Sequence, residues 1–167
     1  MVKNDLGERV AVYTGSFDPI TLGHLNVIER GSRLVDKLIV GIGVNVEKQS
    51  LFSPTERSDL VREVSRHLPN VEVKVFQGLA VSFVHQSRAR LMLRGIRPLT
   101  DIAAEFTMML ANRELDPDVE TVFLMADQSL AHVSSSLIKQ IAPLATDEML
   151  AKFIPREIIA PLREKLK

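Results

Sequence analysis

Short runs of β-branched and other apolar residues alternate along this chain with segments in which apolar residues recur at helical spacing. The short runs predict strands over residues 10–14, 38–44, 71–76, 90–94 and 119–125. The periodic segments predict helices over residues 23–35, 54–67, 79–87, 101–115 and 134–142, with C-terminal helical turns over 147–152 and 155–166. This alternation predicts an α/β fold: a doubly wound five-stranded parallel sheet, covered on both faces and followed by C-terminal helices.

Length and composition restrict the classes of protein that fit. With 167 residues and no repeat or linker, we expect a single domain over residues 1–167, whose core needs neither disulfides nor metal. The formal net charge of zero gives no bulk attraction for nucleic acid. The absence of cysteine excludes a thiolate nucleophile and is compatible with a reducing cytosol. The N-terminus lacks the apolar segment of a signal peptide, and no apolar run could span a bilayer, so we expect no membrane partner.

The first predicted strand leads into a loop that combines a glycine, short polar residues and a histidine. Gly15 permits a turn that a Cβ would resist, Ser16 adds a hydroxyl, and Asp18-Pro19 is a turn signal. Helical spacing then begins and places His24 in the first turn. Free N–H groups and the positive end of the helix dipole meet there, so a phosphate would contact Ser16, the amides near Phe17 and His24. The alternative is an ordinary turn with a capping histidine.

Polar residues also follow the other predicted strands, at the edge where ligands bind in doubly wound sheets. Lys48 lies in the loop after the second strand. By position alone it is a solvated lysine, but its place at the same edge as His24 favours a phosphate contact. The next helix starts with a capping box over residues 53–56, and we place Arg57 on the exposed face of that helix.

Two arginines flank a glycine after the fourth predicted strand. Arg94 and Arg97 can present guanidinium groups to phosphate oxygens, and Gly95 lets the backbone approach a ligand, although such a strand end could equally meet solvent. The helix predicted over 101–115 is apolar on more than one face, so it is either buried or in contact with a partner. Glu105 interrupts that helix, and either a structural ion pair or a nucleotide contact would account for it.

Two further features of this helix and of the C-terminal third stay open. Met108 and Met109 are either core filler, the commoner case, or the lining of a pocket for a long ligand. Three serines over 134–136 open the next helix; one is expected as its N-cap, and together they offer a second anion site. By themselves His85 and His132 are best interpreted as structural, and no histidine and carboxylate spacing predicts metal ligands from protein side chains.

These groups are suited to stabilising charge rather than to covalent catalysis. A phosphate acceptor is already an anionic nucleophile, so the protein would only hold two anions in line and neutralise the charge that develops. Mg²⁺ would travel with a polyphosphate substrate, bound mainly by phosphate oxygens and water.

The Gly-Ser-Phe-Asp-Pro loop over 15–19 and the Thr-x-Gly-His segment over 21–24 resemble the signature that the nucleotidyltransferase superfamily shares with class I aminoacyl-tRNA synthetases. From residue 10 to about residue 155 the chain resembles the phosphopantetheine adenylyltransferase family. The resemblance implies a Rossmann-like fold and reversible transfer of AMP from ATP to 4′-phosphopantetheine, giving dephospho-CoA and pyrophosphate in coenzyme A biosynthesis by in-line attack. It also implies Mg²⁺, a cytoplasmic location and a homohexamer, and it leaves feedback by CoA open.

The resemblance assigns roles residue by residue. The implied catalytic residues are His24, as the stabiliser of the transition state, Lys48 and Arg97. The implied contacts to phosphopantetheine come from Ser16, Lys48, Ala80 and Arg94. The implied ATP site consists of Ser16, Phe17, His24, Gly95, Ile96, Arg97, Glu105, Leu130, Ala131, His132, Val133, Ser134, Ser135 and Ser136. The chain departs from the family pattern, which has proline or aromatic residues at these positions, at Thr14, Ala104, Leu130 and His132.

Other functions fit parts of the same pattern. A related nucleotidyltransferase would use nicotinate mononucleotide or glycerol phosphate as its acceptor, and the residues Arg94 to Arg97 with Lys48 favour phosphopantetheine. A binding module would sense ATP or CoA without turnover, which His24 and Lys48 disfavour. A fragment of a class I synthetase is disfavoured because no tRNA-binding domain or basic surface is present.

Overall fold

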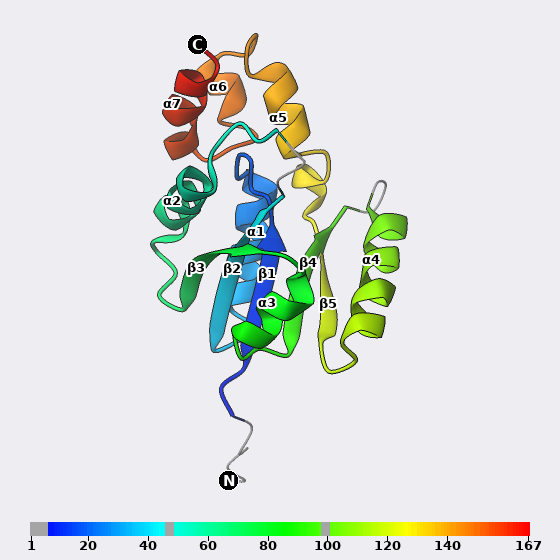
Figure 1. Cartoon of the computed structure of the whole chain (residues 1–167). Helices are drawn as coiled ribbons and strands as arrows, with labels where there is room; N and C mark the ends of the chain where they lie inside the picture. Colours follow the sequence, from blue (N-terminus) through cyan, green and yellow to red (C-terminus); the bar gives the residue numbers. More distant parts are fainter. Residues whose placement is uncertain (1–6, 46–48, 98–100) are drawn as a thin grey trace.

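A computed structural model of the chain describes residues 7–45, 49–97 and 101–167. Its centre is a sheet of five parallel strands in the order β3-β2-β1-β4-β5 (Figure 1). The strands are β1 (Val10–Gly15), β2 (Lys37–Val44), β3 (Val71–Gln77), β4 (Leu91–Ile96) and β5 (Glu120–Met125). The predicted doubly wound parallel sheet is confirmed, and its strand order reverses between β1 and β4.

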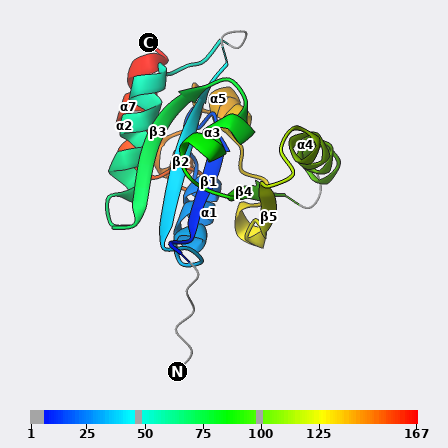
Figure 2. The ribbon, with the colours of Figure 1, turned by 60° about the horizontal axis from the view of Figure 1, so that its bottom comes forward.

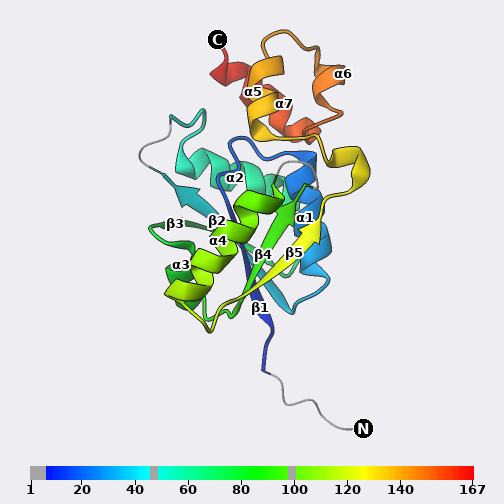
Figure 3. The same cartoon turned by 90° about the vertical axis from the view of Figure 1, so that its right-hand side faces the viewer.

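Helices cover both faces of this sheet and one of its ends. One face carries α1 (Leu22–Ser32) and α2 (Pro54–Ser65), and the other carries α3 (Ala80–Gln86) and α4 (Ile102–Leu115). Beyond the carboxyl ends of the strands lie α5 (Ser135–Ile141), α6 (Asp147–Leu150) and α7 (Arg156–Lys165), opposite the N-terminus (Figures 1 and 3). A 3₁₀ turn over Gln128–Leu130, which the sequence analysis did not predict, precedes α5.

Alternation along β1 divides the core in two. Ala11 and Tyr13 face α1, where they share a cluster with Ile28, whereas Val12 faces α3 and packs with Val81. The C-terminal segment extends the first cluster through apolar residues that are almost completely buried, namely Ile138, Leu150, Ile154, Ile158 and Leu162. The sheet and the C-terminal helices therefore share one core.

The C-terminal segment also bonds directly to α1 and α2. The N–H of Leu22, the first residue of α1, donates to the carbonyl of Phe153 at 2.8 Å. Lys165 of α7 forms an ion pair with Glu56 of α2 at 2.7 Å. The start of α1 is thus held by a residue from the far end of the chain.

The predicted elements are all present, with one difference that matters for the site. β4 continues to Ile96 because its ladder with β5 runs to the pair Ile96 and Met125. Gly95 and Ile96 therefore lie inside this strand, whereas the strand predicted from the sequence ended at Arg94.

Helix α4 lies at the edge of the molecule beyond β5, apart from α1, α2 and α7 (Figure 2). Within α4, all of which is described, the buried residue is Asn112, whose Nδ2 lies 3.7 Å from Met92 Sδ. Its large apolar side chains are mostly exposed, as at Phe106, Met108 and Leu110. The interpretation of Met108 as core filler is therefore wrong. Across the described residues, no helix combines the length and the apolar character needed to cross a membrane.

Candidate active site

A cavity of about 330 Å³ opens at the carboxyl ends of β1 and β4, where the strand order reverses. Doubly wound sheets bind their ligands at this position. The predicted site residues that line the cavity are Ser16, His24, Arg94, Gly95, Arg97, Glu105, Leu130, Val133, Ser134, Ser135 and Ser136. Residues from both halves of the chain therefore meet at one place.

The loop after β1 is a tight turn built around Phe17. Phe17 has a positive φ of 49°, and its ring is 1% exposed, with edge contacts to Tyr13 and His24 at centroid distances of 5.4 and 5.1 Å. A Cβ on Gly15 would meet this ring at 3.0 Å, so a larger residue at this position would press on the buried ring. Packing of the ring offsets the conformational cost of the turn and holds Ser16 at the cavity.

Asp18 anchors the turn from behind. Its carboxylate accepts hydrogen bonds from the N–H groups of Leu51 and Phe52 at 2.9 and 2.8 Å and from Lys139 Nζ at 3.1 Å. These partners come from the loop before α2 and from α5. The carboxylate therefore fastens the turn to two distant elements.

Arg57 is the second anchor, and its predicted exposure is wrong. The side chain is buried, at 2% exposure, and Nη1 donates to the carbonyls of Ser16 and Gly43 at 2.7 and 3.1 Å. Burial lowers the pKa of Arg57, while the nearby Asp18 acts in the opposite direction. Spacing could have identified it, because Arg57 precedes Val61 by four residues and Val64 by seven, which places all three on one helix face.

His24 occupies the third position of α1 and completes a capping box with Thr21. The His24 N–H donates to Thr21 Oγ1 at 3.3 Å, and the Thr21 N–H donates to His24 Nδ1 at 3.1 Å. Because Nδ1 accepts this bond, the proton of the neutral imidazole resides on Nε2. Burial lowers the pKa of His24 to about 4, and the positive charges of Arg97 and Arg94 add to this effect. At neutral pH the ring is therefore an uncharged Nε2–H donor in the cavity wall.

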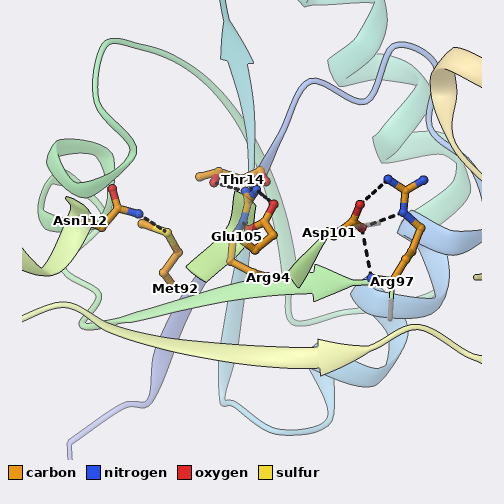
Figure 4. Close-up of polar contacts among 7 residues, drawn as sticks. All are labelled: Thr14, Met92, Arg94, Arg97, Asp101, Glu105 and Asn112. Carbon is orange, nitrogen blue, oxygen red and sulfur yellow. Dashed lines mark hydrogen bonds and ion pairs between the residues drawn. The ribbon is translucent and has the colours of Figure 1, made fainter. Parts of the chain in front are cut away.

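Two carboxylates orient the two arginines at the end of β4 (Figure 4). Glu105 of α4 binds Arg94, and Asp101, the residue before α4, binds Arg97. Arg94 Nε and Nη2 donate to Glu105 at 2.7 and 2.6 Å, and Arg97 Nε and Nη2 donate to Asp101, both at 2.7 Å. Burial acts to lower the pKa of Arg94, but Glu105 outweighs it and holds this pKa above its ordinary value. The hydrogen bond to Asp101 raises the pKa of Arg97. The guanidinium groups are thus fixed and fully charged at the cavity.

The serines at the start of α5 have different contacts: one caps the helix and another bonds to the turn after β1. Ser134 is the N-cap, since its Oγ accepts from the Leu137 N–H at 3.1 Å, as predicted for one of the three. Ser135 Oγ donates to the carbonyl of Pro19 at 2.8 Å and links α5 to the turn after β1. Ser136 also lines the cavity.

Some predicted site residues lie away from the cavity wall. Phe17 and Ile96 are buried, Ala80 packs against the cluster around Val12, and the ring of His132 meets Phe153 edge-on at 5.7 Å. Ala131, next to His132, is also absent from the lining. Lys48 lies outside the described residues. The roles predicted for these six residues, like those predicted for the residues that line the cavity, stay predictions.

The described residues hold no group of three or more His, Cys, Asp or Glu side chains placed to bind a metal ion. Asp101 and Glu105 reach the cavity, but each binds an arginine.

Residues 12–141 match the family described as Cytidylyltransferase-like. The chain is 65% identical over 162 residues to the phosphopantetheine adenylyltransferase of Rhodopirellula baltica, an alignment that covers 96% of this chain and 90% of the relative. This chain belongs to the phosphopantetheine adenylyltransferase family. Another member of that family, from Clostridium botulinum (strain Eklund 17B), is 46% identical over 95% of this chain and 99% of its own length.

Solved structures share the fold of this family member at low sequence identity. The Plasmodium falciparum nicotinic acid mononucleotide adenylyltransferase complexed with NaAD superposes with a TM-score of 0.72 at 13% identity, over 94% of this chain and 95% of that one. A putative nicotinate-nucleotide adenylyltransferase from Vibrio parahaemolyticus gives a TM-score of 0.68 at 18% identity, over 95% and 94%. The Rossmann-like nucleotidyltransferase fold implied by the sequence is thus confirmed.

Sequence reasoning missed three polar residues of this phosphopantetheine adenylyltransferase family member. Asp101 orients Arg97, Arg57 holds the turn after β1, and Thr14 contacts Arg94 from the end of β1. Asp101 was predictable from its position four residues after Arg97, because this spacing suits an ion pair at a helix start. No local signal identifies Thr14 as a partner of Arg94, since the two are 80 residues apart.

Proposed function

We propose that this protein catalyses the reversible transfer of AMP from ATP to 4′-phosphopantetheine, which yields dephospho-CoA and pyrophosphate in coenzyme A biosynthesis. Membership of the phosphopantetheine adenylyltransferase family is the observation that carries the proposal. The cavity between β1 and β4 supports it, because it joins two helix starts, two charged arginines and a neutral histidine donor.

The reaction needs no covalent intermediate. An oxygen of the acceptor phosphate forms a bond to the α-phosphorus of ATP while the bond from that phosphorus to the pyrophosphate oxygen breaks in line. The acceptor is an anion at neutral pH and therefore needs no general base. Catalysis then consists of alignment and of neutralising the charge on the transferring and leaving groups.

Each group has a part in this scheme. The Nε2–H of His24 donates to an oxygen of the transferring phosphoryl group, and Arg97 neutralises charge on the ATP phosphates. Ser16 and the amides of its turn bind phosphate at the start of α1. Arg94, together with Lys48, binds the phosphate of phosphopantetheine.

Mg²⁺ enters as part of the Mg–ATP substrate and supplies additional positive charge to the pyrophosphate. The ligands of the ion would be phosphate oxygens and water, because Asp101 and Glu105 form ion pairs with arginines.

We also propose that residues 1–167 act as one nucleotidyltransferase domain, in the cytoplasm, and assemble as a homohexamer. The exposed apolar side chains of α4, among them Phe106, Met108 and Leu110, support assembly because contact with another copy would remove them from water.

The test is pyrophosphate release by the purified protein with ATP, Mg²⁺ and one acceptor at a time. We expect release with 4′-phosphopantetheine and none with pantetheine, nicotinate mononucleotide or glycerol phosphate. Release with another acceptor alone would replace the substrate, and ATP binding without release with any acceptor would make the protein a nucleotide sensor.

A further inference from the structure

Thr14 is a buried polar residue whose side chain the scheme above does not use. It lies in β1 next to the phosphate turn, is 5% exposed and lines the cavity. Alternate residues of a strand face the same side, so Thr14 shares the α3 face with Val12. Arg94 shares the α3 face with Met92 for the same reason, and the strand pair Tyr13 and Leu93 sets the two polar residues side by side.

Thr14 and Glu105 together determine where the Arg94 guanidinium lies (Figure 4). Arg94 Nη1 donates to the carbonyl of Thr14 at 2.9 Å and to Thr14 Oγ1 at 3.3 Å, while Nε and Nη2 are taken by Glu105. Any residue at position 14 would offer the backbone carbonyl, but Oγ1 belongs to the threonine side chain. The hydroxyl therefore adds a contact that the backbone alone does not provide.

The proton of this hydroxyl is available to a ligand. Oγ1 accepts from Arg94, and within the described ranges the Thr14 hydroxyl donates to no acceptor. A hydroxyl that accepts from a cation is polarised, which strengthens it as a donor. An anion that meets Arg94 in the cavity would complete the chain of bonds from Nη1 through Oγ1 to an anionic oxygen.

The face of the sheet on which Thr14 lies indicates which substrate supplies the anion that meets Arg94. His24 belongs to α1, on the opposite face, and the turn at Ser16 leads into the same helix. Thr14, Arg94 and Glu105 therefore line the cavity from the α3 and α4 side, whereas Ser16 and His24 line the same cavity from the α1 side, where the helix start suits the ATP phosphates. This grouping suits the second phosphorylated substrate.

We propose that Thr14 is a binding residue for the acceptor phosphate, whose hydroxyl donates to a phosphate oxygen while Arg94 donates to the hydroxyl. The inference rests on the proposed function, because it takes 4′-phosphopantetheine as the acceptor. Its consequence is selectivity: Thr14 strengthens binding of the phosphorylated acceptor and contributes nothing to binding of pantetheine.

The experiment compares Thr14→Val, which removes the hydroxyl at nearly constant shape, with Thr14→Ser, which keeps it. Thr55→Val, at an exposed position in α2, is the matched control. Calorimetry measures the affinities for 4′-phosphopantetheine, pantetheine and a non-hydrolysable ATP analogue, and thermal unfolding verifies that each variant is folded. A hydrogen bond to a charged group predicts about tenfold weaker binding of phosphopantetheine to Thr14→Val, with the other two affinities unchanged. Thr14→Ser and Thr55→Val should match the wild type within about threefold.

Wild-type affinity for phosphopantetheine in Thr14→Val would overturn the inference, as would an equal loss in Thr14→Ser or an equal loss for the ATP analogue. These outcomes leave the proposed function intact as long as the wild type releases pyrophosphate with phosphopantetheine. A wild type that neither binds nor uses phosphopantetheine would instead remove the proposed function, and this inference with it.

Discussion

At the scale of single residues, the backbone selects the chemical form of His24. The Thr21 N–H bonds Nδ1, and burial beside two arginines disfavours the charged ring. A neutral ring with its proton on Nε2 can donate to an anion at any pH near neutrality. The neutral ring carries no positive charge, so the positive charge at the cavity comes from Arg94 and Arg97.

Replacing His24 by Ala should lower kcat by about 10²-fold to 10³-fold, the usual loss for one donor to a developing anion. ATP affinity, measured by calorimetry, should change much less, because the donor acts on charge that gathers in the transition state. His24→Gln, whose amide can donate from a similar position, should retain more activity than His24→Ala. Equal losses in kcat and in ATP affinity would contradict this role.

The pKa of His24 also makes stability depend on pH. It is about 4 in the folded protein against 6.5 for a free histidine, so below pH 6.5 the unfolded chain takes up a proton that the folded chain does not. The free energy of unfolding should therefore fall as the pH drops from 6.5 towards 4, by at most about 1.4 kcal/mol per pH unit from this group. Urea unfolding across this range tests it, and His24→Gln should show a shallower decline than the wild type.

At the scale of elements, the turn after β1 is stabilised mainly by other segments. Arg57 of α2 binds the carbonyl of Ser16, Lys139 of α5 binds Asp18, and Ser135 of α5 binds the carbonyl of Pro19. Two helices that are far apart in the sequence thus meet behind the turn after β1. The geometry of this turn depends on the docking of α2 and α5.

Substituting Arg57 with Met should destabilise the protein by about 2 kcal/mol, because the buried carbonyls of Ser16 and Gly43 lose the donor that satisfies them. Urea denaturation measures the change. Arg66→Met, at the C-cap of the same helix, is the control, since the Arg66 side chain is 72% exposed, and this variant should stay within about 0.5 kcal/mol of the wild type. A stability equal to that of the wild type in Arg57→Met would show that the turn does not need this anchor.

Elements with local signals were predictable from the sequence. The capping box before α2 and the position of His24 in α1 depend on residues within one turn, and the structure has both. The end of β4 was not predictable in the same way, because pairing with β5 carries it to Ile96. The partners of the buried Arg57 are also distant in the sequence: Ser16 lies in the turn after β1 and Gly43 lies in β2.

At the scale of the whole molecule, α4 separates two environments. One side of this helix supplies Glu105 to the cavity, while Phe106, Met108 and Leu110 are exposed at the edge of the sheet. If other copies cover these residues, α4 forms the interface between copies and also carries Glu105, which orients Arg94. The state of assembly would then influence the site.

Leu110→Glu should shift the protein from the proposed hexamer to smaller species, because a carboxylate at a 62% exposed apolar position would be buried without a partner in the assembly. Sedimentation velocity measures the change. Leu144→Glu, in the connection between α5 and α6 at 91% exposure, is the matched control and should leave assembly unchanged. A hexamer that tolerates the first substitution would exclude this face of α4 as the interface.

Tyr13 is the one tyrosine in a chain that has no tryptophan. Its ring is 6% exposed, meets Phe17 edge-on and lies in the cavity wall. Under ultraviolet excitation the intrinsic fluorescence of the whole protein therefore comes almost entirely from one ring beneath the site. A ligand that alters the charge around Arg94 or the packing of Phe17 changes this emission, so binding can be followed in the unlabelled protein by optical titration.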